Sequence, residues 1–411
     1  MPLTDSFVLE PSQDQETVEN RSTSHPDIAA NTFPEGGLRA WMSVLGGFMI
    51  MVCTLAFGSS FGVYQDYYTR ISLDEHATSQ ISWIGSLQTF LLFGSGIYTG
   101  RLYDKGYFWH LMGAGSILYW ISLFMLSLAQ PHHYYQNFLS QGLGLGLAMG
   151  MLFVPGLSVV SQYFQARRST AMGGVLAGSG VGGVIWPIIL NHMFNTSAGF
   201  GWAVRTSGFI TVVLLSLASI LIKPRLPPRA PTQQPNMLYI LRDTSYSICL
   251  AGSVIIYLGI FFPFFYLQLF SSFHGVSPKL DPYTIPILNG AALFGRTVPN
   301  IFADRYGTLN VFMGCSIITG VVIISMLGAT SSGGVITFAI LYGFFSGGAI
   351  SLTAPVFASF ANTDEEIGTR IGIGTFSFSF ALLCGNPISG ALLDSPRYFW
   401  TRPILFNAVR T

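Results

Sequence analysis

Charged residues are scarce in this chain. Only 9% of its 411 residues are charged, half are hydrophobic, and the mean hydropathy is +0.52. A soluble protein of this size needs a more highly charged surface to stay in solution. Apolar runs long enough to cross a bilayer recur along the chain. The sequence therefore predicts an all-α, polytopic protein embedded in a lipid bilayer.

The residue patterns of most chemical sites are also missing. The four cysteines lie in apolar segments without metal-ligand spacing, so we interpret them as small membrane hydrophobes. There is no nucleophile elbow, metal cluster or phosphate loop, and no basic stripe with interleaved aromatics. Glycine-rich runs such as "GLGLGLAMG" lie inside apolar spans rather than in a nucleotide-binding unit. We therefore expect no enzyme activity, no cofactor, no metal and no nucleic-acid partner.

Apolar runs alternate with polar segments in a regular order. They predict spans at about 41–63, 81–100, 108–130, 134–161, 168–190, 200–222, 246–270, 282–303, 308–329, 334–360 and 367–392. The polar stretches between and before them divide the chain. We predict a disordered cytosolic tail at 1–38, a six-helix bundle at 39–222, a cytosolic linker at 223–245 and a second bundle at 246–411.

The basic residues fall mostly on one side of this predicted topology. That side holds Arg21, Arg39, Arg101, Lys105, Arg167, Arg168, Lys223, Arg225, Arg229, Arg242, Arg305 and Arg370, and the other holds Arg70, Arg205 and Lys279. Cytosolic loops carry an excess of lysine and arginine. The N-terminus is therefore predicted to be cytosolic, in the plasma membrane or an internal membrane.

Three pairs of landmarks recur at one offset of 200 residues. They are Asp104 and Asp304, Pro155 and Pro355, and Pro187 and Pro387. Matching landmarks on matching spans predict an internal repeat of six helices. The repeat predicts a twelfth helix from near residue 400 to about 422, whereas the chain stops at Thr411. We expect this helix to be missing or truncated, either in a shortened product or in an eleven-span variant.

Two short loops carry the first family resemblance. "GRLYDKGY" closes the second span and "NIFADRYG" closes the eighth, and both resemble the loop after the second helix of the major facilitator superfamily. The resemblance implies two six-helix bundles and a latch on the cytosolic side. The predicted gating residues are Gly100, Asp104, Lys105, Gly106, Asp304, Arg305 and Gly307, with Arg167 and Arg168 as basic partners. Tight turns with solvated charges remain the alternative.

Two longer stretches resemble a narrower family. "PEGGLRAW" precedes the first span, and "YFQARRSTAMGGVLAGSGVGGVIWP" runs through the fifth. Both are similar to signatures of the monocarboxylate porter family in its fungal branch. The glycines of the fifth span predict a flat face that a neighbouring helix approaches closely. Static packing and a sliding surface are both open.

Arg296 is the main candidate for substrate binding. A charge near mid-membrane costs about 2.5–3.5 kcal/mol on insertion scales, and such residues usually face a cavity. The resemblance implies that this arginine meets a substrate anion, and a guanidinium suits a carboxylate. Asn289 lies on the same helix face, and Ser59 and Trp186 complete the predicted binding set.

The sequence departs from that family where proton handling is concerned. Ala292 stands where the carboxylate carriers have an aspartate, and Ser59 stands where they have a lysine. The predicted spans contain no carboxylate. A proton-symport mechanism is therefore not implied, and the coupling ion is open.

These observations predict a secondary active transporter that moves a small organic solute by alternating access. Carboxylate-bearing solutes are favoured, and proton coupling and direction are open. The alternative is a non-transporting sensor or an inactive truncated product on a transporter scaffold.

Overall fold

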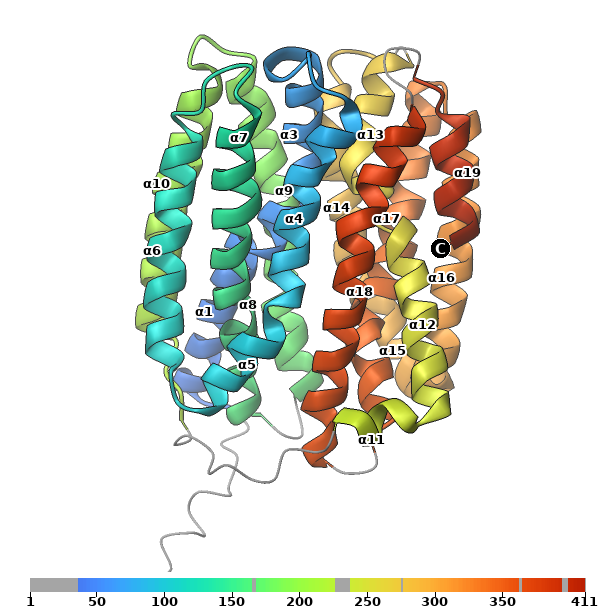
Figure 1. Ribbon diagram of the computed structural model, residues 1–411. Helices are drawn as coiled ribbons and strands as arrows, with labels where there is room; N and C mark the ends of the chain where they lie inside the picture. The colour runs from blue at the N-terminus through green and yellow to red at the C-terminus, as the bar shows by residue number, and fades with distance from the viewer. Residues whose placement is uncertain are drawn as a thin grey trace, which may run out of the picture. The chain divides into compact units, whose positions relative to one another are not determined.

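A computed structural model describes residues 36–164, 168–225, 237–274, 276–361, 364–393 and 398–410 (Figure 1). These residues are helical or lie in the connections between helices. The predicted tail, most of the predicted linker and Arg167 lie outside the described residues, as do the side chains of Asp104, Arg168 and Asp304.

The N-terminal helices run from α1 to α10. They are α1 (Leu38–Cys53), α2 (Leu55–Ser59), α3 (Phe61–Tyr67), η1 (Tyr68–Ser72), α4 (Thr78–Gly94), α5 (Gly96–Asp104), α6 (Phe108–Leu126), α7 (Tyr134–Asn137), η2 (Phe138–Leu145), α8 (Gly146–Ser158), η3 (Val160–Gln162), α9 (Arg168–Phe194) and α10 (Gly199–Leu221).

The C-terminal helices run from α11 to α19. They are α11 (Met237–Arg242), α12 (Thr244–Gly259), α13 (Phe262–Phe273), η4 (Asp281–Tyr283), α14 (Thr284–Gly295), α15 (Val298–Tyr306), α16 (Thr308–Ser325), η5 (Met326–Gly328), α17 (Ser332–Ser359), α18 (Asp364–Leu393) and α19 (Thr401–Arg410).

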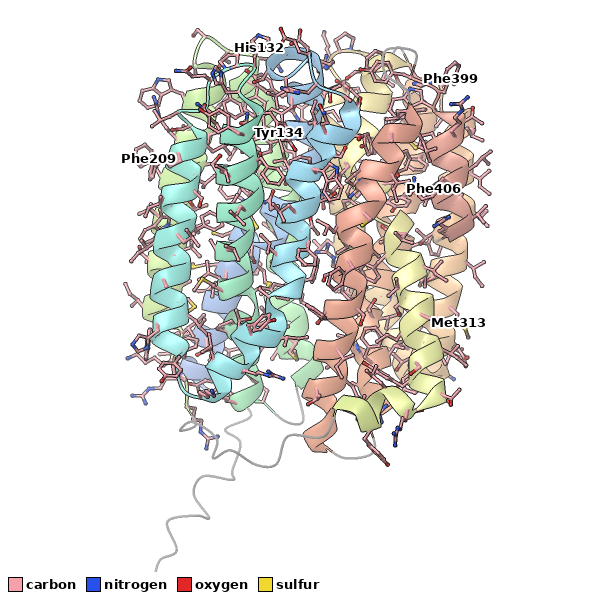
Figure 2. All side chains as sticks on the ribbon, in the orientation of Figure 1. His132, Tyr134, Phe209, Met313, Phe399 and Phe406 are labelled. Atoms are coloured by element: carbon pink, nitrogen blue, oxygen red, sulfur yellow. The ribbon has the colours of Figure 1, made fainter. Side chains whose placement is uncertain are left out.

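Nine helical segments of the described chain are long and apolar enough to cross a membrane. They match nine of the predicted spans. The other two predicted spans, 81–100 and 282–303, are each divided into two shorter helices, α4 with α5 and α14 with α15. The all-helical, multi-span fold is confirmed. Large apolar side chains such as Phe209 and Met313 point away from the bundle, where lipid is expected (Figure 2).

The break between α14 and α15 lies at Arg296 and Thr297, which we had expected to lie inside one helix. Pro299 explains it, because a proline has no N–H to bond the carbonyl of Gly295 four residues earlier. The break between α4 and α5 falls at Ser95. The repeat offset of 200 residues places the equivalent of Ser95 one residue before Arg296, so the two breaks nearly coincide in the repeat. Arg296 therefore sits at a helix end rather than in a helix interior.

The first span is longer than the sequence indicated. Its helical segments run without a loop from Leu38 to Ser72, so the predicted end near residue 63 was wrong. Asp66 lies in the extension and is only 2% exposed. It pairs with Arg70 one turn later, which offsets much of its charge. The expectation that no span contains a carboxylate was also wrong.

The glycines of α9 allow close approach on two faces, as expected. A Cβ on Gly178 would lie 2.2 Å from the carbonyl oxygen of Phe48 in α1. A Cβ on Gly183 would lie 2.8 Å from the side-chain amide of Asn289 in α14. The same helix therefore packs tightly on an N-terminal and on a C-terminal helix.

The two loops that follow α5 and α15 have the same backbone feature. Gly106 and Gly307 both have positive φ, at 88° and 89°. L-residues with a side chain rarely adopt this conformation, which explains the glycine in both copies of the motif. Figure 1 shows α5 and α11 near one end of the helices, which we call the α5 end. The opposite end, which holds η4, is called the η4 end.

The last described helix, α19, begins where the repeat predicts a twelfth helix. It packs on α12, α16 and α18, and Asn407 exchanges hydrogen bonds with Ser389 of α18. Whether this helix is truncated stays a prediction.

Candidate functional site

Arg296 is buried between the N-terminal and C-terminal helices, with 9% of its surface exposed. Its Nη1 donates a hydrogen bond to Ser179 Oγ of α9, while its Nε has no hydrogen-bond partner among the described residues. The ion pairs of the described chain join Asp66 to Arg70 and Asp243 to Arg370, with weaker contacts at His132. None involves Arg296. The guanidinium thus keeps donor capacity for an anion.

Asn289 lies two turns before Arg296 on α14 and is fully buried. Its Nδ2 donates to the carbonyl of Ile285 at 3.2 Å, and its Oδ1 has no partner in the described part of the chain. Its side chain packs against Gly183. Two predicted binding residues therefore share the α9–α14 interface, and each has an unused polar group.

Aromatic rings lie beside Arg296. Tyr257 of α12 lies near the guanidinium and stacks on Phe378 of α18, with ring centroids 3.9 Å apart. Phe93 of α4 packs edge-to-face on Phe378, with ring centroids 5.5 Å apart. Tyr257 Oη also lies 3.0 Å from Thr353 Oγ1. Sequence analysis missed these residues because an aromatic in an apolar span gives no signal of its own.

Ser59 and Trp186 make contacts within the N-terminal helices. Ser59 Oγ donates to the carbonyl of Ala56 at 2.9 Å. Trp186 is buried, donates from its indole N–H to the carbonyl of Val52 at 2.8 Å, and packs edge-to-face on Phe57. Their role in substrate binding stays a prediction.

The described gating residues cluster at the α5 end. Gly100 lies in α5 against α8, and Lys105 caps α5. Arg305, at the end of α15, lies over the ring of Tyr306. The predicted latch depends on the side chains of Asp104, Arg167, Arg168 and Asp304, which lie outside the described residues, so the latch stays a prediction.

The two signature stretches from the sequence meet at the same end. Trp41 of α1 packs edge-to-face on Phe164, with ring centroids 5.5 Å apart. Next to it, Tyr163 Oη donates to the carbonyl of Lys223 at 2.6 Å. The two stretches therefore tie α1 to the chain that follows α8 and α10.

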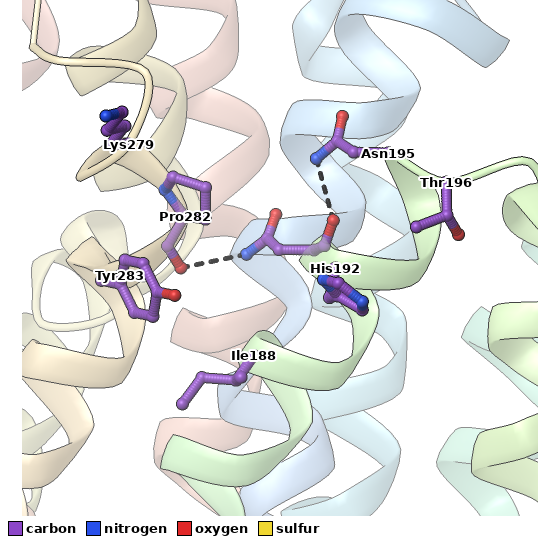
Figure 3. Close-up of a pocket in the computed structure, with 8 residues that line it drawn as sticks. Ile188, His192, Asn195, Thr196, Lys279, Pro282 and Tyr283 are labelled. Atoms are coloured by element: carbon purple, nitrogen blue, oxygen red, sulfur yellow. Dashed lines mark hydrogen bonds between the residues drawn. The ribbon is translucent and has the colours of Figure 1, made fainter.

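A pocket of about 370 Å³ opens at the η4 end, far from Arg296 (Figure 3). Its lining comes from the end of α9, the turn after it and the chain around η4. The lining residues are Ile188, Asn191, His192, Asn195, Thr196, Lys279, Pro282 and Tyr283. Asn191 Nδ2 donates across it to the carbonyl of Pro282 at 3.2 Å. Arg296 lies 14 residues after Pro282, which is about 21 Å of helix. The pocket and the arginine are separate features.

A polar cluster joins the N-terminal and C-terminal helices beside this pocket. We call it the outer cluster, and it consists of Asp66, Arg70, Asn191, Gln268, Ser271, Ser272 and Asp281. Sequence analysis missed Asp66 because the first span was ended too early. The i, i+4 spacing of Asp66 and Arg70 was the available signal, since oppositely charged residues at this spacing favour a continuing helix.

The described residues form a multi-span helical bundle with a partly unpaired buried cation, and they hold no group of three or more potential metal ligands. This arrangement suits a carrier of small solutes.

A family profile of the Major Facilitator Superfamily matches residues 40–298. The chain is 43% identical to the aspyridones efflux protein apdF of Emericella nidulans over 92% of this chain and 77% of that protein.

Two further comparisons agree. The chain is 38% identical to the agnestins efflux protein AgnL12 of Paecilomyces divaricatus, over 86% of this chain and 81% of that protein. The fold is similar to the crystal structure of the nucleoside transporter NupG, with a TM-score of 0.66, 15% identity, and coverage of 91% of this chain and 96% of that one. The chain belongs to the major facilitator superfamily, and it is a membrane transporter rather than an enzyme.

Proposed function

We propose that this transporter exports a small secondary metabolite that carries a carboxylate or similar anionic group. The observation that supports this most directly is Arg296, a buried guanidinium with an unsatisfied Nε and no described carboxylate partner. Leaving a buried charge uncompensated is costly, so a bound anion would stabilise it. The narrower resemblance to fungal monocarboxylate porters points the same way.

Export is the proposed direction because two relatives are named as efflux proteins. The proposed orientation has the N-terminus and the α5 end in the cytosol, from the distribution of lysine and arginine. The η4 end then faces away from the cytosol. Substrate would enter from the α5 end, reach Arg296, and leave after the outer cluster opens.

The proposed binding set is Arg296 with Asn289 and the ring of Tyr257. In this account the substrate anion takes the place of the Ser179 hydroxyl on the guanidinium. Because the Arg296–Ser179 bond joins an N-terminal to a C-terminal helix, its loss would loosen the α9–α14 interface. Substrate binding and helix movement would thereby be linked, because Arg296 contacts Ser179 in the substrate-free state and the anion in the substrate-bound state.

Transport by reconstituted protein tests this proposal. Labelled organic acids, including the metabolites named for the relatives, would be followed in proteoliposomes that hold wild type, Arg296→Ala or Arg402→Ala. Arg402 of α19 is an exposed arginine that lies over the ring of Phe399, so it controls for loss of positive charge. We expect Arg296→Ala alone to lose transport of at least one acid. Equal transport of every acid by all three proteins would refute the anion site. The absence of any transport by wild type would favour a non-transporting protein.

A further inference from the structure

The outer cluster is a largely buried connection between five elements, α3, η1, α9, α13 and η4. Asp66 of α3 is 2% exposed, Gln268 of α13 is 2% exposed, and Asn191 of α9 is 5% exposed. Gln268 Nε2 donates to Asn191 Oδ1 at 2.8 Å and lies 3.4 Å from Asp66 Oδ2. Ser272 joins Asp66 to Asp281, the first residue of η4. This end of the protein is therefore closed by side chains from both sets of helices.

The two oxygens of Asp66 are not equally satisfied. Oδ2 accepts from Arg70 and faces Gln268 Nε2. The donor nearest to Oδ1 is Ser272 Oγ, at 3.5 Å. That hydroxyl lies 2.9 Å from Asp281 Oδ2 and 3.0 Å from the carbonyl of Gln268, and it has a single hydrogen. Among the described residues, Asp66 Oδ1 therefore lacks a well-placed donor although its side chain is buried.

The charges in the cluster do not balance. Asp66 and Asp281 are two carboxylates, and the one ion pair that either of them forms among the described residues joins Asp66 to Arg70. The other titratable groups on the packed elements are His192 of α9, His274 after α13, Lys279 before η4, Tyr283 of η4 and the tyrosines Tyr64, Tyr67, Tyr68 and Tyr266. His274 is held against Phe270 and its carbonyl. Lys279 is exposed and lines the adjacent pocket. The ionised cluster carries one net negative charge, and Asp66, which holds one of its two carboxylates, is buried.

We propose that closure of the η4 end binds one proton, which Asp66 and Asp281 share through Ser272. The proton resides on Asp66 Oδ1 and is donated to Ser272 Oγ, while the Ser272 hydrogen is donated to Asp281 Oδ2. Arg70 and Gln268 remain on Asp66 Oδ2. Every polar atom of the bridge then has a partner, and the cluster becomes neutral. Two carboxylates that share a site favour one shared proton for this reason.

The proposal names a coupling ion for the transport cycle and to that extent rests on the proposed function. Opening the η4 end must separate α3 from α13, and this admits water to both carboxylates. The shared proton is then released, because hydrated carboxylates are stable as anions near neutral pH. Low external pH therefore favours the closed state, and high external pH favours the open one.

Thiol accessibility tests the proposal without any substrate, so its failure is distinct from failure of the anion site. Thr284, at the start of α14, is 1% exposed and bonds the backbone of Asp281. Thr284→Cys would be placed in a background with Cys249 and Cys384 replaced by serine, because the other two cysteines are buried. Labelling by a membrane-impermeant maleimide applied to the η4 face would be measured from pH 5 to pH 8 and corrected for thiolate fraction with a model peptide.

We expect the corrected labelling rate to rise at least fivefold across this range. In Asp66→Asn, which cannot ionise, the rate should stay low and independent of pH. Asp281→Asn should give the same result. The charges of Asp66 and Arg70 then cancel, so closure needs no proton. Asp74→Asn is the matched control, since Asp74 is exposed in the loop after η1, and it should follow the parent profile.

Two results would overturn the proposal. One is a corrected rate in the parent protein that does not change with pH. The other is a pH dependence that survives in Asp66→Asn or in Asp281→Asn. Gel filtration of each variant confirms folding before labelling, and either of the two asparagine variants suffices for the comparison.

Discussion

At the scale of single residues, buried charge decides where function can be sought. Arg296 and Arg370 are both buried arginines, yet their surroundings differ. Arg370 of α18 bonds Asp243 Oδ2 at 2.8 Å and lies over the ring of Tyr246. Arg296 has a serine hydroxyl and an unpaired Nε. The first arrangement stabilises the fold, and the second leaves a donor that a ligand could use.

The Arg370–Asp243 pair gives a prediction about pH. The hydrogen bond from Arg370, together with that from the backbone N–H of Tyr246, holds the pKa of Asp243 below its usual range. A lowered pKa contributes stability that is present above about pH 4 and lost as the pH falls through the folded-state value. We expect Asp243→Asn to lower the melting temperature in detergent at pH 7, by the equivalent of about 1 kcal/mol.

The difference between wild type and Asp243→Asn should shrink as the pH falls below about 4. A double variant, Asp243→Asn with Arg370→Met, separates the pair from its surroundings. If the losses of stability in Asp243→Asn and in a single Arg370→Met variant add up to the loss in the double variant at every pH, the pair has no coupling and this account of Arg370 is wrong.

Asn289 gives a second prediction at this scale. Replacing it with alanine removes a buried oxygen that has no described partner, so we expect little loss of stability. If Asn289 contacts substrate, Asn289→Ala should weaken the apparent affinity for a transported acid by about tenfold. Thermal unfolding and transport kinetics on the same preparation would distinguish the two effects. Unchanged kinetics would remove Asn289 from the binding set.

At the scale of helices, close packing of α9 is the feature most open to test. Gly178 faces the backbone of Phe48, whereas a Cβ on Gly173 of the same helix would meet nothing within 4 Å. We expect Gly178→Ala to destabilise the protein by about 1–3 kcal/mol through overpacking. Gly173→Ala should be neutral or stabilising, because alanine favours a helix more than glycine does. Melting temperatures of the two variants give the comparison, and equal values would contradict it.

Helix positions were the part of the fold that could be predicted from the sequence. The apolar runs located the described spans because a bilayer forces every backbone polar group into a helix. Errors arose where a local effect outweighed hydropathy. Asp66 and Arg70 offset each other's charge and prolonged the first span, and Pro299 divided the eighth. The spacing of landmarks also predicted where α19 begins.

The site was harder to predict because it depends on contacts between distant spans. Arg296 and Asn289 were identified from polarity in an apolar run. Their partners Ser179 and Gly183 lie on α9, more than 100 residues away in the chain, and no local pattern pairs them. The outer cluster needed side chains from α3, η1, α9, α13 and η4. A single sequence carries no record of such pairings.

At the scale of the whole molecule, the α9–α14 interface is where binding and movement would be joined. A Cβ on Gly183 would press on the amide of Asn289, 2.8 Å away, across this interface. We expect Gly183→Ala to reduce transport more than Gly173→Ala does, with similar amounts of folded protein in the membrane. Comparable transport by both variants would show that close approach of these helices is not needed for the cycle.

The central claim is that Arg296 recognises an anionic group, and discrimination between an acid and its methyl ester tests it most directly. Transport of a substrate acid and of its neutral ester would be measured in proteoliposomes with wild type and with Arg296→Gln. We predict that wild type prefers the acid by at least about tenfold and that Arg296→Gln loses this preference. The same preference in both proteins would contradict the account.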